Sequence, residues 1–244
     1  MIYGPRRSYD FDPQGLISED NVNLLNEEYL RKQVVSYETP LLIDTLNSIY
    51  IIPVSIKTLK KPEEVVAVNE QHLDLLDVSF NARRLKKSSY YNYRQFDGNY
   101  ANIIIYNAMQ DRTFSLFNER IIIGNVEAYY FQDDILMVFY TASKDTDKNG
   151  VIDLSDLRSL CIYSLNTGEM RVITDEENQI MHYGFIENSK NLLVEFKLKD
   201  YKESQFASIG SPRKIMKYAF DTKKLRNVIP DDIQKEMQKL VEGK

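Results

Sequence analysis

Short apolar runs, each about the length of a β-strand, alternate with polar turns along most of the chain. Residues 135–140 form one of the longest runs and are apolar at every position, which is typical of a strand covered on both faces. The polar breaks at residues 132–134 and 187–191 separate pairs of such runs. Breaks of this length predict hairpin turns, so we expect neighbouring strands to pair antiparallel.

A tyrosine within an apolar run recurs along the chain at intervals of 56, 57 and 55 residues, at Tyr50, Tyr106, Tyr163 and Tyr218. Turns rich in Asn, Asp and Gly follow the last three tyrosines, and a second apolar run follows each turn. Two more strand-like runs precede each tyrosine: residues 34–37 with 41–43, 75–80 with 90–93, 126–131 with 135–140, and 181–186 with 192–198. The pattern therefore predicts an all-β domain over residues 30–230, built from four repeats of about 56 residues with about four strands each.

Four-stranded antiparallel units of this length resemble the blades of a β-propeller of the TolB type. The resemblance implies blade-like sheets that pack face to face around an axis. Four blades are few for a propeller. A closed ring, an open arc of blades and a fragment completed by another copy all remain open.

The two ends of the chain differ from the repeats. Residues 1–29 are largely polar and contain Pro5 and Pro13, which predicts an extended N-terminal arm. Residues 231–244 predict a short C-terminal helix that Asp231 or Asp232 would cap. Its apolar residues share one face, which we expect to pack against the last repeat: Ile233, Met237, Leu240 and Val241.

Composition narrows the partners that the chain can have. The 36 acidic residues outnumber the 31 basic ones, giving a net charge of −5, and no basic face emerges that would bind nucleic acid. The single cysteine, Cys161, excludes an intramolecular disulfide and any cysteine-based zinc cluster. We expect Cys161 and His182 to be packed strand residues. No apolar run is long enough to span a bilayer, although an anchor trimmed before Met1 remains open.

One chemical motif stands out, a twelve-residue acidic loop at residues 145–156 with the spacing D-x-D-x-N-G-x-I-D-x-x-D. A calcium ion takes six to eight oxygen ligands, and loops of this length supply them from positions 1, 3, 5, 7, 9 and 12. The predicted ligands are therefore the side chains of five residues and one backbone carbonyl: Asp145, Asp147, Asn149, the carbonyl of Val151, Asp153 and Asp156. Gly150 would permit the sharp turn, and Ile152 would point into the core.

The loop resembles EF-hand loops, and dockerin loops more closely because it closes with Asp rather than Glu. Those families use paired loops between helices, whereas this chain has one loop between strand-like runs. Paired helices are what open in a calcium sensor. We therefore expect a structural Ca²⁺ and not a signalling switch, and dockerin function does not carry over.

No phosphate-binding loop, zinc motif or catalytic triad accompanies the repeats. This favours a non-enzymatic binding or scaffold module, a calcium-stabilised platform for a protein or glycan partner. The alternative is a hydrolase or sugar-processing enzyme whose carboxylates, from different repeats, meet at the propeller axis. Use of calcium favours a periplasmic or extracellular location, and a cytoplasmic one remains open.

Overall fold

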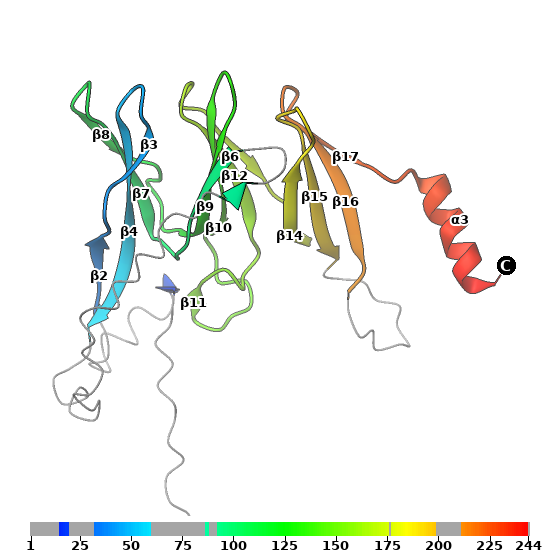
Figure 1. Cartoon of the computed structure of the whole chain (residues 1–244). Coiled ribbons are helices and arrows are strands. Elements are labelled where there is room, and N and C mark those ends of the chain that lie inside the picture. Colours follow the sequence, from blue (N-terminus) through cyan, green and yellow to red (C-terminus); the bar gives the residue numbers. More distant parts are fainter. Residues whose placement is uncertain are drawn as a thin grey trace, which may run out of the picture. The chain divides into compact units, whose positions relative to one another are not determined.

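A computed structural model describes residues 15–19, 32–59, 86–87, 92–175, 177–198 and 211–243 (Figure 1). These residues are mostly β, in antiparallel sheets, with one C-terminal helix. The chain divides into two compact units that are not contiguous in sequence. The first unit comprises Met1–Ala82, Asp97–Gly124 and Ala142–Asp156, and the second comprises Arg83–Phe96, Asn125–Thr141 and Leu157–Lys244. The predicted strand at residues 75–80 and most of the predicted N-terminal arm lie outside the described residues.

The first unit is organised around one long strand, β4 (Ile49–Leu59). One edge of β4 pairs with β2 (Lys32–Tyr37) and β3 (Leu41–Asp44) in turn, and its other edge pairs with β7 (Asn102–Asn107). The strand at the far edge, β8 (Arg112–Ser115), pairs with β7. A separate two-stranded ladder joins β1 (Leu16–Ile17) to β11 (Val151–Ile152).

The second unit holds most of a six-stranded sheet and all of a four-stranded one. The six-stranded sheet has the order β13-β12-β10-β9-β6-β5, with these bounds: β5 (Lys86–Lys87), β6 (Asn92–Phe96), β9 (Ile122–Tyr130), β10 (Ile135–Ala142), β12 (Ser159–Ser164) and β13 (Met170–Ile173). The four-stranded sheet runs in chain order: β14 (Asn178–Phe185), β15 (Leu192–Leu198), β16 (Arg213–Ala219) and β17 (Lys224–Asn227). The predicted hairpins at residues 126–140 and 181–198 are confirmed as β9 with β10 and β14 with β15.

These two sheets of the second unit share one hydrophobic core. Strand β15 shows how the sequence specifies it: Leu192, Val194 and Phe196 are fully buried, whereas the intervening Leu193 is 40% exposed. Successive side chains of a strand point to opposite faces, so one face of β15 joins the core and the other is open. The buried residues pack against apolar side chains of the six-stranded sheet, including Leu136, Val138, Leu160 and Ile162.

The prediction that four evenly spaced tyrosines mark four separate repeats is wrong for the first two tyrosines. Tyr50 on β4 and Tyr106 on β7 are direct cross-strand partners in one sheet, with ring centroids 6.3 Å apart. The other three tyrosines do occupy matching places, because Tyr106, Tyr163 and Tyr218 each lie on the strand that pairs with a short outermost strand. The described residues therefore form three large sheets where the spacing predicted four.

Three further expectations need correction. His182 is exposed on β14, not packed, because it faces away from the core beside Glu195. The predicted helix exists as α3 (Asp231–Glu242), but none of its residues is buried, so its apolar side does not pack on the last sheet. Pro230 is the N-cap and no side chain caps the helix, so neither Asp231 nor Asp232 plays the predicted part. Cys161 is buried, as expected.

Among the helices that the structure describes, none has the length and apolar character needed to cross a membrane.

Candidate metal centre

The acidic loop at residues 145–156 connects β10 to β12, which are neighbouring strands of the six-stranded sheet (Figure 1). Its only regular structure is β11, which pairs antiparallel with β1 near the start of the chain. Leu16 lies opposite Ile152 and Ile17 opposite Val151, and the Ser18 amide donates to the Gly150 carbonyl at 2.9 Å. The loop is thus joined to a segment more than a hundred residues earlier in the sequence.

Ile152 anchors the loop in the protein, as its place in the motif predicted. It is 5% exposed and lies in a small apolar cluster with Ile122 and Ala142. Leu16 and Leu154 pack against the same cluster. Burial of these side chains holds the loop against the rest of the first unit without any help from an ion.

Strand β1 is itself fixed by side chains from elsewhere in the first unit. The Gln33 amide group donates to the Gly15 carbonyl at 2.8 Å and accepts from the Ile17 amide at 3.2 Å. The Arg120 guanidinium donates to the Ile17 carbonyl at 2.5 Å. Gly15 has no room for a side chain, because a Cβ there would lie 2.3 Å from the Ile152 carbonyl oxygen.

Three carboxylates of the loop converge. Asp145, Asp147 and Asp156 each offer one oxygen, and these oxygens lie within 4.8 Å of one another. Calcium binds oxygens at about 2.3 to 2.6 Å, so two ligand oxygens on one ion can be up to about 5 Å apart. The spacing of the three oxygens therefore fits a single calcium ion.

Hydrogen bonds within the loop hold these carboxylates in place. Asp145 accepts from the amides of Asn149 and Gly150, at 3.1 and 2.9 Å. Asp156 is fully buried and accepts from the Thr146 amide at 2.5 Å and the Asp153 amide at 2.9 Å, which ties the two ends of the loop together.

The turn in the middle of the loop uses the left-handed backbone region. Gly150 has φ of 91°, which only glycine adopts readily, and Lys148 has φ of 61°. The predicted role of Gly150 in the turn is thus visible in the backbone.

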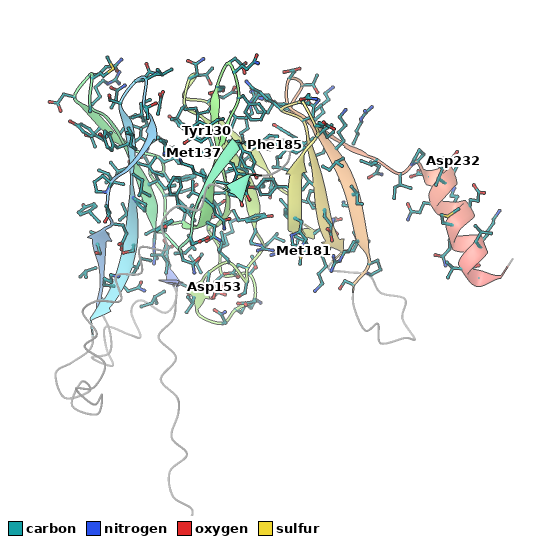
Figure 2. All side chains as sticks on the ribbon, viewed as in Figure 1. Tyr130, Met137, Asp153, Met181, Phe185 and Asp232 are labelled. Atoms are coloured by element: carbon teal, nitrogen blue, oxygen red, sulfur yellow. The ribbon has the colours of Figure 1, made fainter. Side chains whose placement is uncertain are left out.

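Two of the other predicted ligands, Asn149 and Asp153, make hydrogen bonds to backbone amides within the loop. Asn149 uses its side-chain oxygen to accept from the Val151 amide at 2.8 Å. Asp153, labelled in Figure 2, accepts from the Ser155 amide at 2.6 Å, and its carboxylate is outside the cluster of three. The ninth position of such loops often reaches the ion through a water, and the place of Asp153 is compatible with that arrangement.

The chemistry of this donor set is that of a hard cation. Three anionic groups at this separation repel one another, and a divalent cation would remove the repulsion while using only oxygen ligands. The nearest side chains add hydroxyl and amide groups but no thiol or imidazole: Thr146, Asn149 and Ser155. The residues present therefore fit calcium.

A second polar cluster, which the sequence analysis did not detect, lies within the second unit. Glu127 on β9 accepts hydrogen bonds from the hydroxyls of Tyr129, at 2.5 Å, and Tyr183, at 2.7 Å. Burial, together with the Glu127 charge, raises the pKa of both tyrosines well above the ordinary value. Both hydroxyls therefore stay protonated and donate to Glu127, so the group cross-links two sheets.

Tyr140 and Arg158 extend this cluster. The guanidinium lies 4.9 Å from the Tyr140 ring centroid and donates to the Ile180 carbonyl at 2.8 Å. Burial raises the pKa of Tyr140 to about 12. The adjacent tyrosines at the end of β9, Tyr129 and Tyr130, were the one signal in the sequence, because the pairing with Tyr183 across sheets is a tertiary property.

Neither a protein-family model nor a curated protein nor a solved structure matches this chain, so its function is argued from its own residues.

Proposed function

We propose that this chain is a non-enzymatic binding or scaffold module, a calcium-stabilised, propeller-like platform that presents loops to a protein or glycan partner. The observation that carries the proposal is the convergence of Asp145, Asp147 and Asp156 in a loop that is anchored by β1 and Ile152.

The propeller-like architecture is supported by the repeated ends of the three large sheets. In each, a strand bearing an aligned tyrosine turns tightly into a short outermost strand: β7 to β8, β12 to β13 and β16 to β17. Each turn contains a residue with positive φ, namely Asp111, Gly168 and Lys223. Repetition of the same hairpin is what blade-like units predict.

A structural role for the ion follows from where the loop is attached. The loop bridges adjacent strands β10 and β12 and also carries the partner of β1. An ion bound there would therefore fix the N-terminal segment to the loop. In a calcium sensor, a pair of helices flanks the loop and opens when the ion binds. No helix flanks this loop on either side within the described residues.

A platform role is supported by exposed apolar side chains at two adjacent turns of the first unit. Leu46 lies in the turn between β3 and β4 and is 87% exposed, and Met109 lies in the turn between β7 and β8 and is 70% exposed. The two turns are neighbours, because the Ala108 amide donates to the Ser48 carbonyl at 3.0 Å. Apolar side chains presented together at loop tips are a feature of protein-binding surfaces.

Calorimetric titration of the metal-free protein with calcium chloride tests the metal site. We expect one ion per chain and a rise in melting temperature, both abolished in Asp145→Asn and Asp156→Asn. The matched control is Asp133→Asn, which removes an aspartate from an exposed turn outside the loop and should titrate like the parent protein. Absence of heat and of any shift in melting temperature at millimolar calcium would remove the metal from the proposal.

Cross-linking of the protein in its native cells tests the platform role. We expect a partner whose capture is lost in the double variant Leu46→Asp, Met109→Asp and kept in Val172→Asp, which changes an exposed valine on β13. Equal capture by all three proteins would contradict the assignment of these turns.

A further inference from the structure

Helix α3 carries an apolar stripe that nothing in the described chain covers. The stripe consists of Ile233, Met237, Leu240 and Val241, which are 45 to 84% exposed. The helix has twelve residues and no side-chain N-cap. Helices this short are marginal in water, and most of their stability in proteins comes from packing of the apolar side. A partner surface is therefore expected for α3.

The outward side of the β14–β17 sheet, as far as the structure describes it, also exposes apolar side chains. At its centre are Leu193, Ile215 and Val228, each 40 to 44% exposed. They lie on the side opposite the buried Val194 and Phe196, as the strand alternation requires.

This side of the sheet also carries an excess of basic residues. The cross-strand registers place five basic residues and one acidic residue on it: Lys197, Arg213, Lys217, Lys224, Arg226 and Glu195. Glu195 is already paired with Arg213 at 2.5 Å. We call this surface, with its three apolar residues, the basic sheet face. It is a local excess of positive charge in a chain whose net charge is −5.

Helix α3 complements the basic sheet face in charge. It has four acidic residues and two basic ones within its bounds: Asp231, Asp232, Glu236, Glu242, Lys235 and Lys239. Two of the acids lie in the first turn. An acidic amphipathic helix and a basic, partly apolar sheet surface are matched both in polarity and in charge.

The two surfaces also match in size. Twelve residues of helix extend about 18 Å, and the seven residues of β15 extend about 23 Å. Four strands at about 4.8 Å spacing give a width that accommodates one helix of about 10 Å diameter.

The connection between β17 and α3 argues against docking on the same chain's own sheet. The Val228 amide donates to the Ile215 carbonyl at 3.1 Å, so the ladder continues past the end of β17. Pro230 follows with φ of −62° and ψ of 153°, and a residue before proline, here Ile229, is disfavoured in the helical region. Both residues resist the sharp reversal that would lay α3 over its own sheet.

We propose that the chain forms a reciprocal homodimer in which α3 of each copy lies on the basic sheet face of the other. Exchange of a terminal element between two identical chains gives a closed two-fold assembly and covers both uncovered surfaces at once. This interface is independent of the calcium loop, which lies in the first unit.

Sedimentation equilibrium of the full chain at micromolar concentration tests the dimer. We expect a dimer for the parent protein and at least a hundredfold weaker association for Met237→Glu on the helix and for Ile215→Glu on the sheet. The control Gln238→Glu places the same new residue beside the stripe and should remain dimeric. Circular dichroism checks that all variants fold, which we expect because the substituted side chains are exposed.

A charge-reversal series tests the arrangement independently. Lys217→Glu with Arg226→Glu should weaken the dimer at least tenfold, and adding Asp231→Lys with Asp232→Lys should restore part of the loss. Three results would overturn the proposal. They are a parent protein that is monomeric at all concentrations, a monomer in which α3 is protected from hydrogen exchange, and a dimer that persists without residues 231–244.

Discussion

At the scale of single residues, Gly15 lies where β1 is attached to the acidic loop at residues 145–156. A Cβ there would lie 2.3 Å from the Ile152 carbonyl and 2.6 Å from a Val151 methyl carbon. Gly15→Ala must therefore push β1 away from β11. We expect a lower melting temperature and about tenfold weaker calcium binding, measured by calorimetric titration.

Gly184 provides the matched control for this change. It lies on β14, its φ is not in the left-handed region, and nothing lies within 4 Å of the place that a Cβ would occupy. Gly184→Ala should leave calcium binding unchanged and can stabilise the fold slightly by restricting the unfolded chain. Equal effects of the two substitutions would show that the β1 contact is unimportant for the loop.

Asp175 makes the free energy of unfolding depend on pH in the acidic range. Burial alone would raise its pKa, but hydrogen bonds from Lys214, at 2.9 Å, and from Asn178 outweigh burial and hold the pKa below the ordinary value of 3.8. A carboxyl whose pKa is lower in the folded state stabilises the protein above its unfolded pKa, and that stability is lost as the pH falls through the folded pKa.

Substitution of Asp175 by Asn should therefore destabilise the protein at pH 7, and the difference from the parent should shrink as the pH falls through the folded pKa. Loss of the charged hydrogen bond from Lys214 should cost about 1 to 3 kcal/mol at pH 7, measured by urea unfolding at a series of pH values. Asp133→Asn is again the control, because that carboxylate is 75% exposed and exposed ion pairs contribute little. A pH-independent difference between Asp175→Asn and the parent would contradict the assignment.

Residue roles that depend on local spacing could be predicted from the sequence, whereas those that depend on tertiary pairing could not. The convergence of Asp145, Asp147 and Asp156, and the burial of Ile152, follow from positions within one twelve-residue loop. His182 was expected to be packed, but a register shift between Ile180 and His182 turns it to the open side. Such a shift has no clear signal in the pattern of apolar residues.

At the scale of secondary-structure elements, hairpins could be predicted and the grouping of hairpins into sheets could not. The pairs β9 with β10 and β14 with β15 follow from two apolar runs around a short polar break. Strand β4, in contrast, continues for eleven residues and pairs with β2, β3 and β7. The pairing of its first half with β7 places Tyr50 beside Tyr106, so residues at an even interval along the sequence are a cross-strand pair within one sheet.

Helix α3 shows the same division between local and tertiary information. Its apolar residues recur at helical spacing, and that pattern predicted both the helix and its apolar side. The pattern does not indicate which protein surface packs against that side of the helix. The charges on the outward side of the β14–β17 sheet become one surface only when the strand registers are known, which is why the sequence could not indicate the basic sheet face.

At the scale of the whole molecule, the two units cannot be separated by a single cut in the chain. The chain passes from one to the other within β9, between Gly124 and Asn125, and again within β10, between Thr141 and Ala142. A strand that loses its hydrogen bonds in one unit therefore disturbs its own continuation in the other. We expect the units to unfold together, in a single calorimetric transition.

Calcium provides the test of this coupling, because the proposed site lies only in the first unit. An ion at a hundred times its dissociation constant stabilises the folded state by about 2.7 kcal/mol. If the units unfold together, that stabilisation must also slow hydrogen exchange through global unfolding in β15 and β16 of the second unit. Exchange measured by mass spectrometry with and without calcium should show equal slowing in β4 and β15, whereas slowing confined to the first unit would mean that the two units open independently.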